Sequence, residues 1–168
     1  ELKKLPKGSW SAEDSLDNNV ISERPIKIKA KVSITDDEFV VDYSGSDDQN
    51  DGTVNSPLGI SIAVANSTFK SITTPNEPTN EGHFSPVKVL APEGNVFNPV
   101  PPAGVFLIWP AAHAYDLIRK ALIQAMPNRI PTCSTGDCYS LMLSGGFSKK
   151  YEYKRFFLYA NDHGGGLG

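Results

Sequence analysis

One strand stands out in this sequence because its side chains alternate without a break from Ile26 to Ile34. Every second residue is apolar, and the residues between them are three lysines and a serine. A period of two is the side-chain repeat of a β-strand that buries one face and exposes the other. A turn at residues 35–38 then leads into a second apolar run, Phe39–Tyr43. We therefore predict an antiparallel hairpin over residues 25–44.

Helical spacing follows this hairpin twice. Apolar residues recur three or four positions apart between Pro57 and Thr74, and again from Pro110 to Ala125, where Pro127 ends the pattern. Shorter strand-like runs lie at residues 84–90, 138–143 and 153–159. Together these patterns predict an α+β fold in which an antiparallel sheet packs against at least two helices, with long loops rich in proline and glycine.

The segments between these elements suggest how the chain is divided. Residues 1–24 are polar and are predicted to be a connecting arm, with a short helix capped near Ser11. Residues 25–168 are predicted to be a single α+β domain. Residues 91–104 contain four prolines, which exclude a regular helix or a central strand, so their order must come from packing. The closing glycine-rich stretch leads us to expect an internal part of a larger subunit.

Composition excludes several classes of protein. Hydrophobic residues make up 39% and charged residues 21% of the 168 residues, and the net charge is -3. No stretch approaches the roughly 20 apolar residues of a membrane-spanning helix, and no basic face suits nucleic acid. Cys133 and Cys138 lack the second pair of ligands that a structural zinc site needs. We interpret them as free thiols, which predicts a soluble, cytoplasmic protein.

Six motifs follow one another along nearly the whole chain. They combine glycine, proline, asparagine and acidic residues in a fixed order, which no single loop motif would specify. They are Leu5–Trp10, Gly45–Pro57, Glu81–Val87, Ala91–Ala103, Pro127–Gly136 and Gly164–Gly168. In this order they resemble the hydantoinase B/oxoprolinase family, which includes acetone and acetophenone carboxylase subunits of that type.

The resemblance implies an enzyme of several subunits. Such subunits are several hundred residues long and work beside a hydantoinase A-like subunit that binds ATP with Mg²⁺. The resemblance therefore implies that this chain is inactive when isolated, and that a transition metal, where one is used, lies outside this segment. Hetero-oligomeric assembly and a small-molecule substrate are implied in the same way.

The reaction has three interpretations. The sequence departs from the family pattern at Trp109–Tyr115 and at Asp137–Tyr139, which favours an ATP-dependent carboxylase of a ketone such as acetone or acetophenone. The alternative is an ATP-dependent hydrolase of a cyclic amide such as hydantoin, 5-oxoproline or a lactam. A third interpretation is a non-enzymatic interaction module whose proline-rich surface docks onto a partner.

His163 is the catalytic candidate within this chain. It follows Asp162 and precedes three glycines, and a glycine-rich backbone can bind an anion beside a general acid or base. The alternative is an exposed histidine at a tight turn. The candidate substrate-binding residues are Ser134, Thr135, Gly164 and Gly165, where small hydroxyl and glycine loops suit a carboxylate or phosphate; an ordinary turn is the alternative.

The remaining polar residues predict structural roles. His83 and His113 are far from each other and from His163, so no metal site is expected from this chain alone. The acidic loop from Asp47 to Asn55 lacks the glycine and the bidentate glutamate of a calcium-binding EF-hand. We interpret it as a hairpin exit and helix-capping region.

Overall fold

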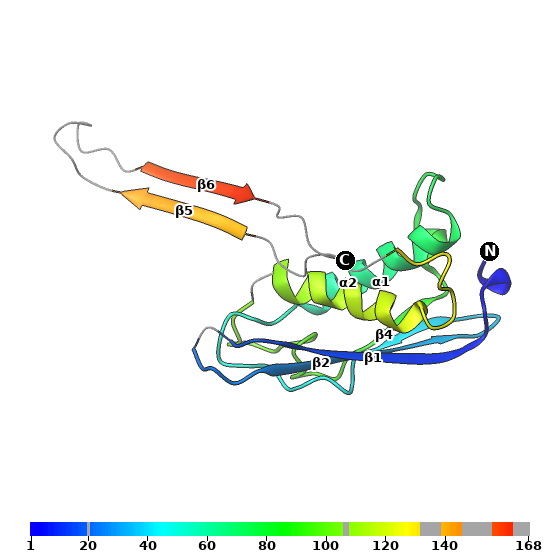
Figure 1. The fold of residues 1–168 in the computed structure, drawn as a ribbon, viewed down its shortest axis with the longest axis horizontal. Helices are drawn as coiled ribbons and strands as arrows, with labels where there is room; N and C mark the ends of the chain where they lie inside the picture. The colour runs from blue at the N-terminus through cyan, green and yellow to red at the C-terminus, as the bar shows by residue number, and fades with distance from the viewer. Residues whose placement is uncertain (20, 106–107, 132–138, 146–155, 163–168) are drawn as a thin grey trace.

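The computed structural model describes residues 1–19, 21–105, 108–131, 139–145 and 156–162. Within these ranges two α-helices lie on one face of a four-stranded sheet, and a second, two-stranded sheet is formed near the end of the chain (Figure 1). The elements in chain order are η1 (Leu2–Lys4), β1 (Gly8–Leu16), β2 (Ile26–Ile34), β3 (Phe39–Asp42), α1 (Leu58–Thr73), η2 (Glu81–Phe84), β4 (Val87–Leu90), α2 (Ile108–Leu122), β5 (Tyr139–Gly145) and β6 (Phe156–Asp162).

The main sheet has the order β1-β2-β3-β4. The predicted hairpin is confirmed, because β2 and β3 pair antiparallel, with Ile34 opposite Phe39. The predicted arm is wrong for residues 8–16, which form β1 and pair antiparallel with all of β2. The short helix near Ser11 is wrong for the same reason. On its inner side β1 carries Trp10, Ala12 and Leu16, but Asp14 interrupts this apolar alternation, and serines fill most of the outer positions. The segment therefore looks like a polar connection in the sequence, and its pairing with β2 is what defines it as a strand.

The last strand of this sheet runs parallel to its neighbour. β4 pairs with β3 in parallel, with Phe39 opposite Val87. Parallel neighbours need a long crossover connection, and α1 supplies it on the helical face of the sheet. The sheet is therefore mixed, not antiparallel throughout, while the predicted α+β class with two packed helices is confirmed.

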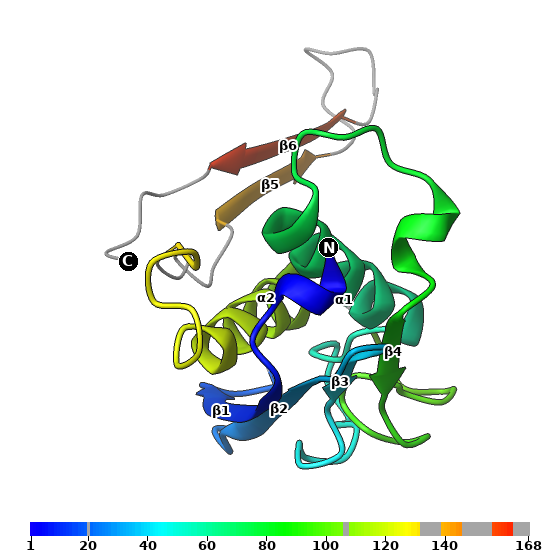
Figure 2. The same ribbon diagram turned by 90° about the vertical axis from the view of Figure 1, so that its right-hand side faces the viewer.

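The core lies between the sheet and the helices (Figure 2). Ile28 and Val32 of β2 are fully buried, as the alternation predicts. Phe39 of β3 packs against Phe69 of α1, with ring centroids 5.2 Å apart. The apolar stripe of α2, represented by Leu117, faces the same core. Both predicted helices are thus confirmed, and each uses its apolar stripe to cover the sheet.

The proline-rich segment after β4 forms neither helix nor strand. Val96 and Phe97 are nevertheless fully buried, and the Phe97 ring lies 4.4 Å from the Tyr43 ring, centroid to centroid. The prediction that packing orders this segment is confirmed. Toward the end of the chain β5 and β6 pair antiparallel. Among the described residues, no helix is long and apolar enough to cross a membrane.

Candidate functional site

Buried amide side chains hold together the two loops at one end of the main sheet. Asn55 is fully buried. Its Nδ2 donates to the carbonyl oxygens of Asn50 at 3.1 Å, Gly52 at 3.2 Å and Gly104 at 2.7 Å. Its Oδ1 accepts a hydrogen bond of 2.9 Å from the backbone N–H of Asn50. A single side chain therefore fixes the loop after β3 and connects it to the segment before α2.

A second buried asparagine connects the same loops from the other side. The Nδ2 of Asn95 donates to the carbonyl oxygens of Tyr43 and Ser46, both at 3.3 Å, and its Oδ1 accepts from the N–H of Phe97 at 2.9 Å. Gln49 Oε1 accepts from the N–H of Val100 at 2.7 Å. Asn98 Nδ2 donates to the Ala91 carbonyl oxygen at 2.9 Å. We call these five residues the amide network: Gln49, Asn50, Asn55, Asn95 and Asn98.

The amide network corrects one prediction. Residues 47–55 are the exit of the hairpin, as expected, but they do not cap α1 through a side chain. The N-cap residue of α1 is Pro57, and no side chain bonds to the first turn. The asparagines bond to loop carbonyls instead, because several carbonyls of these loops are buried and have no strand or helix partner. The glycines and asparagines of the Gly45–Pro57 motif were visible in the sequence, but their distant partners were not.

A polar cavity of about 340 Å³ lies beside this network. Its walls come from the β1–β2 connection and from the loop after β3. The lining residues are Asn19, Ser22, Arg24, Pro25, Ile26, Asp47, Asp48, Gln49, Asn50 and Asp51. Asp47 already serves the fold, since its Oδ2 accepts a hydrogen bond of 2.9 Å from the N–H of Lys27. The cavity is lined by one arginine and three aspartates, which suit a small polar molecule. Among the described residues, its lining contains no histidine that could activate a nucleophile, so it has no pair of side chains suited to covalent catalysis.

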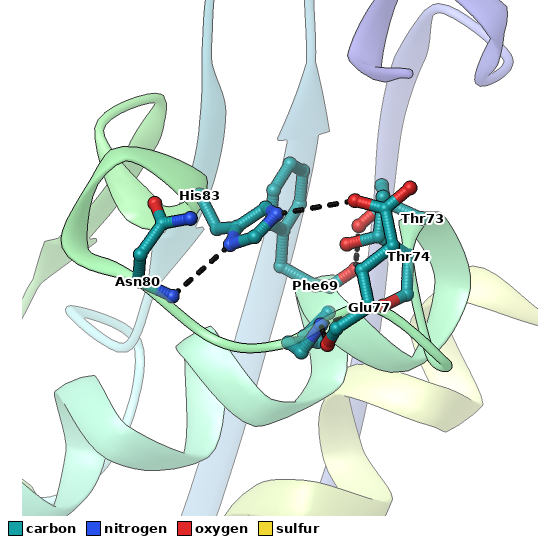
Figure 3. A network of polar contacts seen from close by, with 7 residues as sticks. Phe69, Thr73, Thr74, Glu77, Asn80 and His83 are labelled. Atoms are coloured by element: carbon teal, nitrogen blue, oxygen red, sulfur yellow. Dashed lines mark hydrogen bonds and ion pairs between the residues drawn. The ribbon is translucent and has the colours of Figure 1, made fainter.

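A histidine–carboxylate pair lies in the loop between α1 and β4 (Figure 3). His83 Nε2 lies 3.4 Å from Glu77 Oε2, an arrangement that orients a general base in many enzymes. Here the other ring nitrogen, Nδ1, accepts a hydrogen bond of 3.2 Å from the N–H of Asn80. Asn80 and His83 form a capping box around η2. Both ring nitrogens are therefore engaged in holding the loop, and we interpret His83 as structural, as the sequence predicts.

The predicted site residues lie outside the described residues. This holds for His163, Ser134, Thr135, Gly164 and Gly165. Among the described residues, no group of three or more histidine, cysteine, aspartate or glutamate side chains is placed to hold a metal ion. Three of the cavity's lining residues are aspartates, which would repel a triphosphate. We therefore assign no step that involves ATP or a metal to this cavity.

Two solved structures share this fold. The ATP-dependent caprolactamase from Pseudomonas jessenii matches with a TM-score of 0.73 and 27% identity, covering 92% of this chain and 27% of that chain. A nucleotide-free structure of acetone carboxylase matches with a TM-score of 0.72 and 15% identity, covering 95% of this chain and 23% of that chain. The α+β domain is thus of a kind found as one segment within larger ATP-dependent enzymes.

Sequence comparisons define the family. The B-type subunit of a putative D-/L-hydantoinase from Pseudomonas sp. (strain NS671) is 29% identical over 162 residues, covering 89% of this chain and 27% of the relative. An uncharacterized protein of Methanocaldococcus jannaschii is 28% identical over 141 residues, covering 83% of this chain and 25% of the relative. The hydantoinase B/oxoprolinase model matches residues 1–168. The chain belongs to this family, which confirms the resemblance, and it spans about a quarter of the length of these relatives.

Proposed function

We propose that this chain is part of the hydantoinase B-like subunit of an ATP-dependent enzyme that hydrolyses a cyclic amide. The observation that carries the proposal is the likeness to the ATP-dependent caprolactamase, with 27% identity over 92% of the chain. The 29% identity to the B-type subunit of a putative hydantoinase supports the same class of substrate. Both relatives are named for enzymes that act on cyclic amides, the class of substrate that the sequence alone placed second.

A carboxylase acting on a ketone such as acetone or acetophenone is the second candidate. The sequence departures at Trp109 and at Asp137–Tyr139 favour it. The fold is compatible with it, since acetone carboxylase contains the same domain, but at 15% identity that likeness concerns the fold alone. Under this hypothesis a transition metal would be bound outside this segment.

In either case we propose that ATP and Mg²⁺ are bound by a hydantoinase A-like partner subunit. The proposal rests on family membership and on the likeness to the B-type subunit of a putative hydantoinase. Within this chain the amide network then has the role of a scaffold: it fixes the two loops at the end of the sheet. His163 remains our candidate for a general acid or base, with Ser134, Thr135, Gly164 and Gly165 as candidates for substrate binding.

Reconstitution of the complete enzyme tests the proposed reaction. The full-length subunit is co-expressed with its ATP-binding partner and supplied with ATP, Mg²⁺ and either a cyclic amide or a ketone with bicarbonate. The cyclic amides are hydantoin, 5-oxoproline and caprolactam, and the ketones are acetone and acetophenone. ATP-dependent ring opening supports the proposal. Incorporation of labelled bicarbonate without ring opening replaces it by the second candidate, and turnover without ATP contradicts both.

A pair of histidine variants tests the proposed site in the same assay. Loss of a general acid or base typically lowers turnover by about 10² to 10⁴-fold. We therefore expect His163→Ala to lower kcat by about a hundredfold or more. His83→Ala is the matched control, since His83 holds a loop, and it should leave kcat within about threefold. Equal small effects of the two variants would remove His163 from the proposed chemistry.

A further inference from the structure

The main sheet has two edge strands, β1 and β4, and β4 is the one whose outer side lacks a bonded partner among the described residues. Two hydrogen bonds of 2.8 Å join it to β3, from the N–H of Phe39 to the carbonyl of Pro86 and from the N–H of Tyr43 to the carbonyl of Leu90. Along a strand, successive residues direct their backbone groups to opposite sides. The N–H and C=O groups of Val87 and Val89 therefore point away from β3. In the described ranges no strand pairs with that side.

The opposite edge, formed by β1, is contacted by side chains from the end of α2. Gln124, just after the end of α2, donates from Nε2 to the carbonyl oxygen of Ser11 at 2.9 Å. Lys120 Nζ forms an ion pair with Asp14. Side chains that occupy an edge in this way prevent it from pairing with another strand. No described side chain is bonded to the outward backbone groups of Val87 or Val89, so the β4 edge lacks this protection.

The residues around β4 add an apolar surface to the open edge. Leu90 is 50% exposed and Val100 is 37% exposed. The hydrogen bond from Asn98 to Ala91 keeps these two segments together. A short edge strand is one way in which proteins leave an edge unpaired, and β4 has four residues. A large exposed leucine on such a strand, however, favours a neighbour, because an added strand would place a side chain beside it.

We propose that β4 is an internal strand in the complete subunit, and that an extended segment of the same polypeptide, outside these 168 residues, pairs with Val87 and Val89. This inference rests on the fold and the family, not on the proposed reaction. The relatives contain about three quarters of their length outside the matched region, since the match covers 25% and 27% of them. A segment of the same polypeptide pairs within one molecule, and for a short connection its effective concentration reaches about the millimolar range, which favours it over a second copy or a separate subunit. The residue of this segment that lies beside Leu90, on the exposed face of the sheet, should be apolar.

Hydrogen exchange of the full-length subunit tests the pairing without any substitution. The amides of Lys88 and Leu90 are on the β3 side of the ladder and serve as internal references. If a strand pairs with the outer side, the amides of Val87 and Val89 should exchange within about tenfold of these references. Exchange that is at least about a hundredfold faster than the references would show an unpaired edge and overturn the proposal.

Cross-linking identifies the occupant. A photoreactive benzophenone side chain is introduced at position 90 of the full-length subunit in its purified complex, and the linked peptides are sequenced. We expect a peptide of the same subunit from outside residues 1–168. A link to the ATP-binding partner or between two copies of the subunit would overturn the proposed occupant. The same side chain at Ser15, on the opposite edge strand, is the control and should give no such peptide.

Discussion

The side chain of Asn55 donates a hydrogen bond of 2.7 Å to the carbonyl oxygen of Gly104, 49 positions further along the chain. The bond joins the loop that leads into α1 to the segment that leads toward α2, so it relates the two helices that cover the sheet. Asn55 is fully buried, and removal of one partner of a buried hydrogen bond leaves the other partner unsatisfied at a cost of about 1–3 kcal/mol. The amide network is therefore a determinant of the fold.

Replacement of Asn55 should destabilise the subunit strongly. Asn55→Ala leaves the carbonyl oxygens of Asn50, Gly52 and Gly104 without their donor, and we expect a loss of about 2–4 kcal/mol. Asn55→Asp keeps the shape but turns an acceptor toward these carbonyls, so its loss should be at least as large. The midpoint of urea unfolding measures the change. Asn76→Ala, at an exposed position, is the control, and similar losses in all three variants would contradict this role.

Gly52 is the second close contact in this region. A Cβ atom at this position would lie 1.9 Å from the carbonyl oxygen of Asn19, which is a backbone atom and cannot move aside alone. Gly52→Ala should therefore separate the β1–β2 connection from the loop after β3 and cost about 2 kcal/mol or more.

A second glycine provides a matched control for this prediction. Gly59 lies in α1, and an added Cβ would meet nothing within 4 Å. Because alanine is the better helix former, Gly59→Ala should leave stability unchanged or raise it by up to about 1 kcal/mol. Urea unfolding should thus show a lower midpoint for Gly52→Ala and an unchanged or higher midpoint for Gly59→Ala. If Gly52→Ala also proves neutral, the two loops do not approach each other as closely as described.

The sequence predicted those parts of the fold whose pattern is local. The alternation of β2 and the three-to-four spacing of α1 and α2 each lie within one element, and all three elements are confirmed. β1 was missed because its stability comes from a partner strand, with Trp10 opposite Val32. The direction of β4 was not predictable either, since it depends on how α1 crosses the sheet.

Long-range partners of polar residues were also not predictable from the sequence, as the amide network shows. The Gly45–Pro57 motif that contains Asn55 is visible in the sequence, and it predicts a hairpin exit and a helix-capping region. A sequence does not say which carbonyl a buried amide reaches, and Gly104 lies in a segment with no periodic pattern. The sequence predicts helix capping for this loop, which is wrong, because no side chain caps α1. The candidate residues His163 and Ser134 stay predictions, because they lie outside the described residues.

Asp14 should make the subunit sensitive to acid. Burial alone would raise the pKa of Asp14, but the hydrogen bonds from Lys120 and from the Ser15 N–H, together with the charge of Lys120, outweigh burial and lower it. A lowered pKa in the folded state adds stability above the pKa of the unfolded chain, and this stability is lost as the pH falls through the folded value. The contribution should therefore be present at pH 7 and disappear below about pH 4.

The variant Asp14→Asn tests this pH dependence. The pair is exposed to solvent by 43% at Lys120 and 38% at Asp14, so we expect a loss of less than about 1 kcal/mol at pH 7. The difference from the unmodified subunit should shrink as the pH falls toward about 3. Urea unfolding at both pH values measures it, with Asp37→Asn in an exposed turn as the control. A difference that is constant with pH would mean that the charge of Asp14 contributes nothing.

His83 provides a prediction that separates loop structure from catalysis. Its Nδ1 accepts from the N–H of Asn80 at 3.2 Å, so the neutral ring must carry its proton on Nε2, toward Glu77. The nitrogen shifts of a histidine-labelled subunit measure this tautomer directly.

Two substitutions then distinguish the roles of the ring. In a capping box a glutamine at this position also accepts from the N-cap N–H, so His83→Gln should keep the turn at η2, while His83→Ala should cost about 1 kcal/mol. Because neither variant removes a base that acts on substrate, both should keep kcat of the reconstituted enzyme within about threefold. If both instead lower kcat by about a hundredfold at unchanged stability, the Glu77–His83 pair acts in the reaction, and the loop between α1 and β4 belongs to the active site.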